Sequence, residues 1–200
     1  MTASRRAARR SEKGAVIVEL AMVVPILLTL VLGMYEIGMA WNASQTVVQA
    51  SRGGARTVSQ LGTFGAADQQ AVLATLATFQ NDVGDVQRIV IFDASNGADL
   101  PSGCDVAGNP TGDCNIYRAA DFAAADDPTH FDTNGDSPGC GGAGASRFWC
   151  PDGDRSDSQT SATEIGVFVE FESERASGLF GSTPFTITRT TVMRVEPRES

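Results

Sequence analysis

The strongest constraint on this chain is an apolar run near its N-terminus, Ala15–Tyr35, in which Glu19 is the only charged residue. A helix over this run would span about 31 Å at about 1.5 Å per residue, close to the hydrocarbon thickness of a bilayer. Glu36 follows at once, so two carboxylates bracket the run near the two headgroup regions. This placement lowers the cost of burying Glu19 but does not explain why a carboxylate is there.

Basic residues crowd the segment before the apolar run. Residues 1–14 hold one acidic residue, Glu12, and five basic ones: Arg5, Arg6, Arg9, Arg10 and Lys13. The whole chain has a formal net charge of −9, so without these four net positive charges the remainder carries −13. A basic segment before a membrane span predicts a cytoplasmic N-terminus, with an extracytoplasmic domain beyond about residue 41. The acidic remainder argues against nucleic-acid binding, because a phosphate backbone requires a basic surface.

Three kinds of N-terminus are compatible with this pattern. A cleavable secretory signal has a small-x-small junction available at 38–40, but its apolar region is normally about 7–15 residues long. The second kind is a plain signal anchor, in which the glutamates have no particular role. The third is a prepilin-like leader, cut between Gly14 and Ala15, which makes Glu19 the fifth residue of the mature chain. In an assembled bundle, Glu19 would pair with the new α-amino group of a neighbouring subunit, and this pairing would set the register.

Several spaced features of residues 12–62 occur together. They are Gly14 before the apolar run, Val18-Glu19-Leu20-Ala21, Pro25, Glu36-Ile37-Gly38 and Gly54-Ala55-Arg56. With these features the segment resembles the TadE family, pilin-like proteins of the bacterial tight-adherence pilus systems. The resemblance implies cleavage by a prepilin-type membrane peptidase and assembly with other pilin-like subunits and pilus assembly proteins. It assigns the processing site to Gly14 and Ala15, and assembly to Glu19, Pro25 and Glu36.

The rest of the chain predicts an α+β domain. The apolar spacing of residues 44–61 predicts that the membrane helix continues as an amphipathic helix, with Gly62 as its C-cap. A second helix is expected at 66–82, and β-branched or alternating patterns predict strands at 86–92, 164–172 and 185–196. The alternation at 164–172 places Ile165, Val167, Val169 and Phe171 on one face of the strand. Because a short connection separates the last two strands, we expect them to pair antiparallel.

The expected plan is a long helix packed on a small antiparallel sheet, as in pilin-like heads. It comprises a basic leader at 1–14, a transmembrane helix at 15–41 and an extracytoplasmic domain at 42–200. The protein would be a single-pass protein of the cytoplasmic membrane, in contact with the lipid bilayer. Residues 93–162 are rich in Gly, Asp, Ser and Pro and are expected to form a loop-rich insert within the domain.

All four cysteines lie in this insert, on the expected outer side of the membrane. Four cysteines allow three pairings, and we favour the local solution, Cys104–Cys114 and Cys140–Cys150. Free thiols and a zinc site are the alternatives. Zinc is disfavoured because no C-x₂-C spacing occurs and the chain has a single histidine, His130.

One stretch of the insert, FDTNGDSPG, partly matches a calcium loop. Asp132, Asn134 and Asp136 have the alternating spacing with which such loops begin. The sixth position is Ser137 rather than glycine, and the twelfth is Ala143 rather than glutamate, so this is not an EF-hand. A plain acidic turn is the favoured interpretation and a weak Ca²⁺ site the alternative; no other cofactor is expected.

No pattern in the sequence predicts catalysis. The single histidine is part of no recognisable triad, and neither a nucleophile elbow nor a glycine-rich phosphate loop occurs. We therefore do not expect an enzyme, and the resemblance implies a structural protein of a tight-adherence (Flp-type) pilus or secretion system. The alternatives are an unprocessed, membrane-tethered adhesion or binding module and a secreted domain released by signal peptidase.

Overall fold

A computed structural model describes residues 4–79, 84–105, 113–131, 148–174 and 183–197, the first ten of them as backbone alone. The chain divides into two units. One unit contains Met1–Trp41 with Arg175–Thr183, and the other contains Asn42–Glu174 with Pro184–Ser200. We call the second unit the head and describe each unit by itself.

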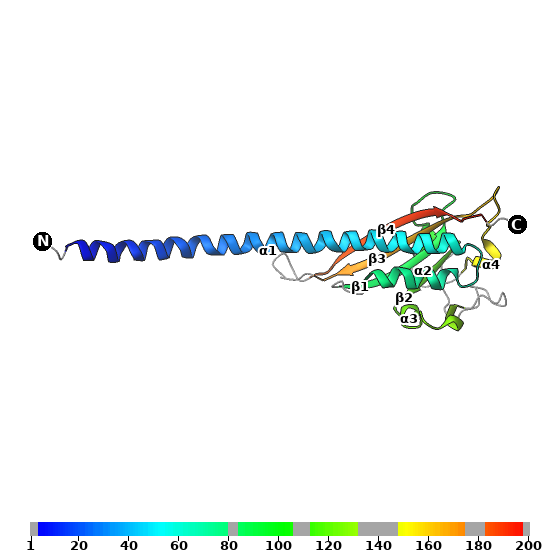
Figure 1. Cartoon of the computed structure of the whole chain (residues 1–200), viewed down its shortest axis with the longest axis horizontal. Helices are drawn as coiled ribbons and strands as arrows, with labels where there is room; N and C mark the ends of the chain where they lie inside the picture. Colours follow the sequence, from blue (N-terminus) through cyan, green and yellow to red (C-terminus); the bar gives the residue numbers. More distant parts are fainter. Residues whose placement is uncertain (1–3, 80–83, 106–112, 132–147, 175–182, 198–200) are drawn as a thin grey trace. The chain divides into compact units, whose positions relative to one another are not determined.

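One long helix, α1 (Ser4–Leu61), runs without a break through the apolar run and into the head. The other helices and strands all belong to the head (Figure 1). In chain order they are α2 (Ala67–Leu76), η1 (Ala77–Phe79), β1 (Gly84–Asp93), η2 (Ser102–Cys104), β2 (Cys114–Arg118), α3 (Ala119–Ala123), η3 (Pro128–Phe131), α4 (Pro151–Asp154), β3 (Glu164–Ser173) and β4 (Phe185–Arg194).

The strands form one antiparallel sheet in the order β2-β1-β3-β4. The β3–β4 pair is antiparallel, as the short connection predicts, and its register joins Phe168 to Thr190. Helices and an antiparallel sheet in one small domain confirm the predicted α+β class.

The strand β2 lies inside the segment expected to be loop-rich, and it is a strand that the sequence analysis did not predict. Its five residues, Cys114–Arg118, pair with Arg88–Phe92 of β1. Four of the five are buried, including the polar Asn115. The strand is too short, and too interrupted by polar residues, for its alternation to stand out from the surrounding Gly- and Asp-rich sequence.

The main core fills the space between the sheet and the helices α1 and α2. Val47 and Val58 of α1 and Val72 of α2 are completely buried in it. The sheet contributes alternate residues of its central strands, which confirms the face predicted for 164–172: Ile89, Ile91, Ile165, Val167, Val169 and Phe171. Burial of these apolar side chains is the main source of the head's stability.

Two glycines of α1 explain how the helix packs and ends. At Gly54 a Cβ would collide with Thr75 of α2, so the absence of a side chain allows the two helices to approach closely. Gly62 ends the helix with φ +55°, and its N–H donates to the carbonyl of Val58 at 2.8 Å. This is the predicted C-cap, in a backbone conformation that favours glycine.

The opposite face of the sheet carries a second, smaller core beneath the segment 94–105. Phe92, Phe168 and Ile116 lie in this core with the disulfide-bonded Cys104 and Cys114. Gly166 lies opposite Phe92 across β1–β3, and a Cβ at Gly166 would enter the Phe92 ring. The disulfide therefore fastens a covering segment to the sheet.

Arg88 holds the same segment by charge. Its guanidinium donates to Glu170 on β3 and, at 2.8 Å, to Asp105 beside the disulfide. Burial alone would lower the pKa of Arg88, but hydrogen bonds to Asp105 and Glu170 and their charges raise it above its usual value. The arginine stays charged and cross-links β1, β3 and the covering segment.

Replacing Cys104 by Ser is expected to lower the free energy of unfolding of the head by about 2–3 kcal/mol, since the bond closes a short loop. The matched control is Ser102→Ala, an exposed position in the same short helix. A maleimide added to the denatured, unreduced protein should label Cys114 in the Cys104→Ser variant, because Cys114 loses its disulfide partner. Peptide mapping that finds the label on Cys140 or Cys150 instead would show that the pairing in solution differs.

Candidate assembly site

The N-terminal part of α1 exposes an apolar surface. Apart from the half-buried Met39, the large apolar side chains from Val16 to Trp41 are between 38 and 71 % exposed. It is the one helix, among the described residues, that is long and apolar enough to cross a membrane. This helix fits a single-pass membrane protein, because such a surface is stable in lipid or against neighbouring helices but not in water.

The residues assigned to processing and assembly all lie on this helix. Gly14 and Ala15 are consecutive helical residues and both are exposed. Glu19 follows Ala15 by one turn, on the same face of the helix, and is also exposed. Glu36 is half-buried and lies about 26 Å further along the axis, at about 1.5 Å per residue. The two carboxylates therefore bracket the most apolar part of α1.

Glu19 has no hydrogen bond or ion pair with any other residue that the structure describes. A carboxylate in this position within lipid would be stable only with a partner from another molecule or near the headgroups. A cut before Ala15 would create an α-amino group at the same end of the helix as Glu19, so a neighbouring parallel subunit would offer its amine at the level of this carboxylate.

Pro25 lies inside α1, which continues on both sides of it. Proline has no backbone N–H, so the carbonyl one turn earlier loses its usual donor. One turn later, the hydroxyl of Thr29 donates to the carbonyls of Ile26 and Pro25, at 2.8 and 3.1 Å. The hydroxyl therefore supplies additional hydrogen bonds to the turn that begins with Pro25.

The other predicted site residues lie in the insert. Cys104 and Cys114 form a disulfide, which is the expected local pairing. Cys150 is also disulfide-bonded. Its expected partner, Cys140, and the candidate calcium ligands lie outside the described residues: Asp132, Asn134 and Asp136. Among the residues that the structure does describe, no cluster of three or more metal-ligating side chains occurs.

Residues 14–56 match the family model TadE, described as TadE-like protein. The N-terminal region of this chain is similar to TadE-like proteins. The match confirms the resemblance and covers about a fifth of the chain, beginning at Gly14 and ending at Arg56. Neither a curated protein nor a solved structure matches the chain.

The TadE-like segment contains every residue assigned to processing and assembly. It begins with the proposed cleavage glycine and includes Glu19, Pro25 and Glu36. The matched segment also extends into the head and includes Gly54, which packs closely against α2. The matched segment therefore combines the exposed apolar helix with the part of α1 that anchors the head.

The head contains a buried polar cluster that sequence reasoning missed. Asp68 of α2 accepts two hydrogen bonds from Arg155, at 2.7 and 2.9 Å, and its side chain is 5 % exposed. Its second oxygen also accepts from Asn115 and from the Tyr117 hydroxyl, each at 2.7 Å. The Arg155 guanidinium lies over the Trp149 ring, 4.3 Å from the ring centre.

This cluster joins segments that are far apart in the chain. Asn115 of β2 exchanges hydrogen bonds with the backbone of Trp149, at 2.7 and 2.9 Å. Asp68 thus links α2 both to β2 and to the segment at the end of the insert. No sequence signal pairs an aspartate with an arginine 87 residues later, because each residue alone is typical of an exposed helix or loop.

Proposed function

We propose that this chain is a pilin-like structural or assembly subunit of a bacterial tight-adherence pilus or secretion system. The match of residues 14–56 to TadE-like proteins is the observation that carries the proposal. The exposed apolar surface of α1 supports it, because a helix assembled in a bundle must present such a surface to neighbours or to lipid. A structural role also agrees with the lack of a catalytic pattern in the sequence.

The assembly mechanism follows from the charges along α1. The basic leader holds the N-terminus in the cytoplasm, and the apolar helix spans the membrane. A prepilin-type peptidase cuts between Gly14 and Ala15, which removes the leader and creates an α-amino group. Glu19 of one subunit then accepts the amine of a neighbouring pilin-like subunit. A carboxylate buried in lipid gains a counter-charge only in the assembled state, so the pair favours one register.

The head would lie outside the cytoplasm, where disulfides such as Cys104–Cys114 form and persist. A second function remains as the alternative outcome: an unprocessed module tethered by α1 and used for binding or adhesion. The two functions predict different mature chains, because only the pilin-like subunit loses residues 1–14.

Replacing Gly14 by Leu is expected to block processing, because a bulky side chain before the scissile bond would not fit the peptidase. Gly38→Leu is the matched control. Apart from the helix's own backbone, no described atom lies within 4 Å of an added Cβ at either glycine, so neither change should disturb α1. In cells with a prepilin peptidase, Gly14→Leu should leave the chain uncut, whereas Gly38→Leu should be cut normally.

The control also tests the competing cleavage site. Gly38 would occupy the small-x-small junction of a signal-peptidase cut before Trp41. If Gly38→Leu blocks processing and Gly14→Leu does not, the chain is a secreted domain and the pilin-like proposal is wrong. Gel mobility of the membrane and soluble fractions distinguishes these outcomes.

A further inference from the structure

One edge of the sheet stops short beside a hollow in the head. The strand β2 pairs with β1 only over Arg88–Phe92, and the chain then continues as the helix α3 from Ala119. The first residues of β1, Gly84–Gln87, therefore have β3 on one side and, among the described residues, no strand on the other. A free strand edge offers backbone N–H and C=O groups to another extended chain.

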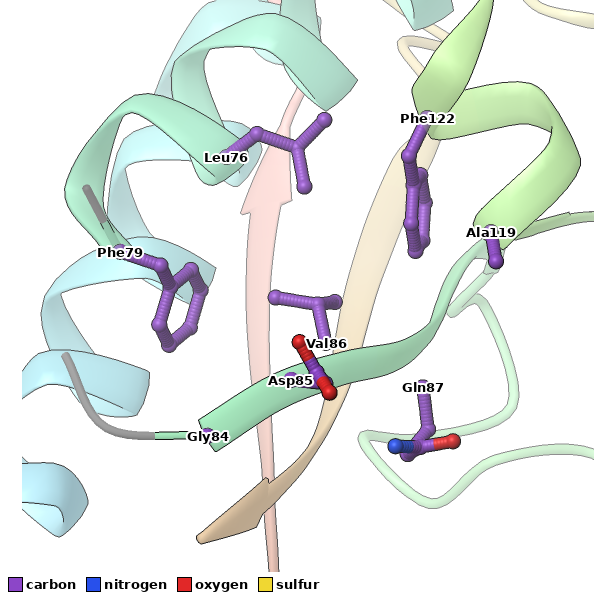
Figure 2. Close-up of a pocket in the computed structure, with 8 residues that line it drawn as sticks. All are labelled: Leu76, Phe79, Gly84, Asp85, Val86, Gln87, Ala119 and Phe122. Carbon is purple, nitrogen blue, oxygen red and sulfur yellow. The ribbon is translucent and has the colours of Figure 1, made fainter.

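The hollow beside this edge is lined by half-buried apolar side chains. Leu76 of α2, Phe79 of η1, Val86 of β1 and Phe122 of α3 surround it, and Figure 2 shows all four directed into the same space. Its volume is about 570 Å³, within the range of sites that hold an apolar group. The ring of Phe79 stacks on the ring of Phe171, with ring centroids 4.9 Å apart, and this contact holds Phe79 in position.

The other face of the same edge carries unbalanced negative charge. Asp85 is exposed and lies directly opposite Glu172 on β3. Two like charges opposite each other in a sheet are destabilising, and no described cation pairs with either. A Lys or Arg from a partner strand beside Asp85 would relieve this repulsion.

We infer that the β1 edge at Gly84–Gln87 binds an extended segment of a different protein, in line with β2. The segment carries a bulky apolar residue opposite Val86, which fills the hollow, and an adjacent Lys or Arg, which approaches Asp85 and Glu172. Side chains alternate between the two faces of a strand, so one of two neighbouring residues can fill the hollow while the other approaches Asp85 and Glu172. This inference concerns the head and does not depend on the assembly role of Glu19.

A second copy of this chain is a poor occupant. In the described part of the head, the bulky apolar residues next to an arginine are held in its own core, except Phe148, which follows Arg147 and is 39 % exposed. The backbone at Phe148 is already bound beside β2, because its N–H donates to the carbonyl of Cys114 at 3.2 Å. Ile89, Tyr117 and Val195 are buried, and Met193 packs against the same cluster. A copy would have to unfold to donate such a segment, and we therefore commit to a different protein as the partner.

The test uses the full chain in detergent and a fluorescent seven-residue peptide of alternating threonine and valine, with lysine followed by phenylalanine at its centre. We expect saturable binding by fluorescence anisotropy, weakened about fivefold when glutamate replaces the lysine. In the variant Asp85→Lys the preference should reverse, so that the glutamate peptide binds more tightly. Asp99→Lys, at an exposed aspartate outside this edge, is the matched control and should keep the lysine preference.

Two further peptides separate strand addition from simple pocket binding. Replacing the phenylalanine by serine should abolish binding, and methylating alternate backbone nitrogens should also abolish it. Equal binding of the lysine and glutamate peptides, or no binding of either, would overturn the inference and leave Asp85 as a charge that merely protects the edge. Self-association of the full chain that Asp85→Lys abolishes would also overturn it, because the occupant would then be a second copy.

Discussion

A Glu19→Ala variant is expected to enter the membrane and lose its leader, yet to fail in assembly, with pilus or secretion output reduced at least tenfold. Insertion should survive because the substitution makes the apolar run more apolar. Assembly should fail because the α-amino group of the neighbouring subunit would lose its counter-charge. Removing one partner of a buried ion pair typically costs about 3–5 kcal/mol, far more than a tenfold effect requires.

Two conservative variants separate charge from size at this position. Glu19→Gln keeps the shape but not the charge, and it should fail like Glu19→Ala. Glu19→Asp keeps the charge on a shorter side chain and should retain part of the output. The assay is quantification of surface pili in a host with an active tight-adherence system. Normal output from Glu19→Gln would contradict the electrostatic role of this residue.

The second large effect is expected at Asp68. Replacing Asp68 by Ala should lower the free energy of unfolding of the head by about 3–5 kcal/mol, because the Arg155 guanidinium would remain buried without a carboxylate. The side chain of Arg155 is completely buried, and its Nε has no hydrogen-bond partner among the described residues. The arginine therefore depends heavily on Asp68.

Chemical denaturation of the full chain in detergent, followed by tryptophan fluorescence, measures this effect, since Trp149 lies against Arg155. Asp99→Ala, at an exposed aspartate, is the matched control and should change the stability little. A change of less than about 1 kcal/mol for Asp68→Ala would show that the cluster contributes little to folding. Such a result would also indicate that Arg155 finds another partner or reaches solvent.

The parts of the fold that could be predicted from the sequence have strong periodic patterns. The apolar run predicts the first half of α1, and the alternation at 164–172 predicts both β3 and its buried face. Gly62 was predictable as a C-cap because the apolar spacing ends just before it. In each case the residues that form the pattern lie within the helix or strand itself or directly beside it.

The missed features depend on partners that are distant in the chain. The strand β2 is stable because β1 pairs with it and Asp68 satisfies its buried Asn115 and Tyr117. The hollow at the edge of β1 arises because β2 ends at Arg118, opposite Arg88, so that the first four residues of β1 have no second neighbouring strand among the described residues. Neither fact follows from local pattern, because pairing register is set by the tertiary fold. The processing and assembly residues stay predictions that rest on motif and charge.

The central claim concerns the N-terminus of the mature protein, and the most direct measurement is its N-terminal sequence and intact mass. The protein should be purified from the membrane of a host with an active prepilin peptidase. The pilin-like account predicts a chain that begins at Ala15. A chain that keeps its arginine-rich leader would contradict this account and leave a tethered module, and one that begins at Trp41 would contradict it in favour of a secreted domain.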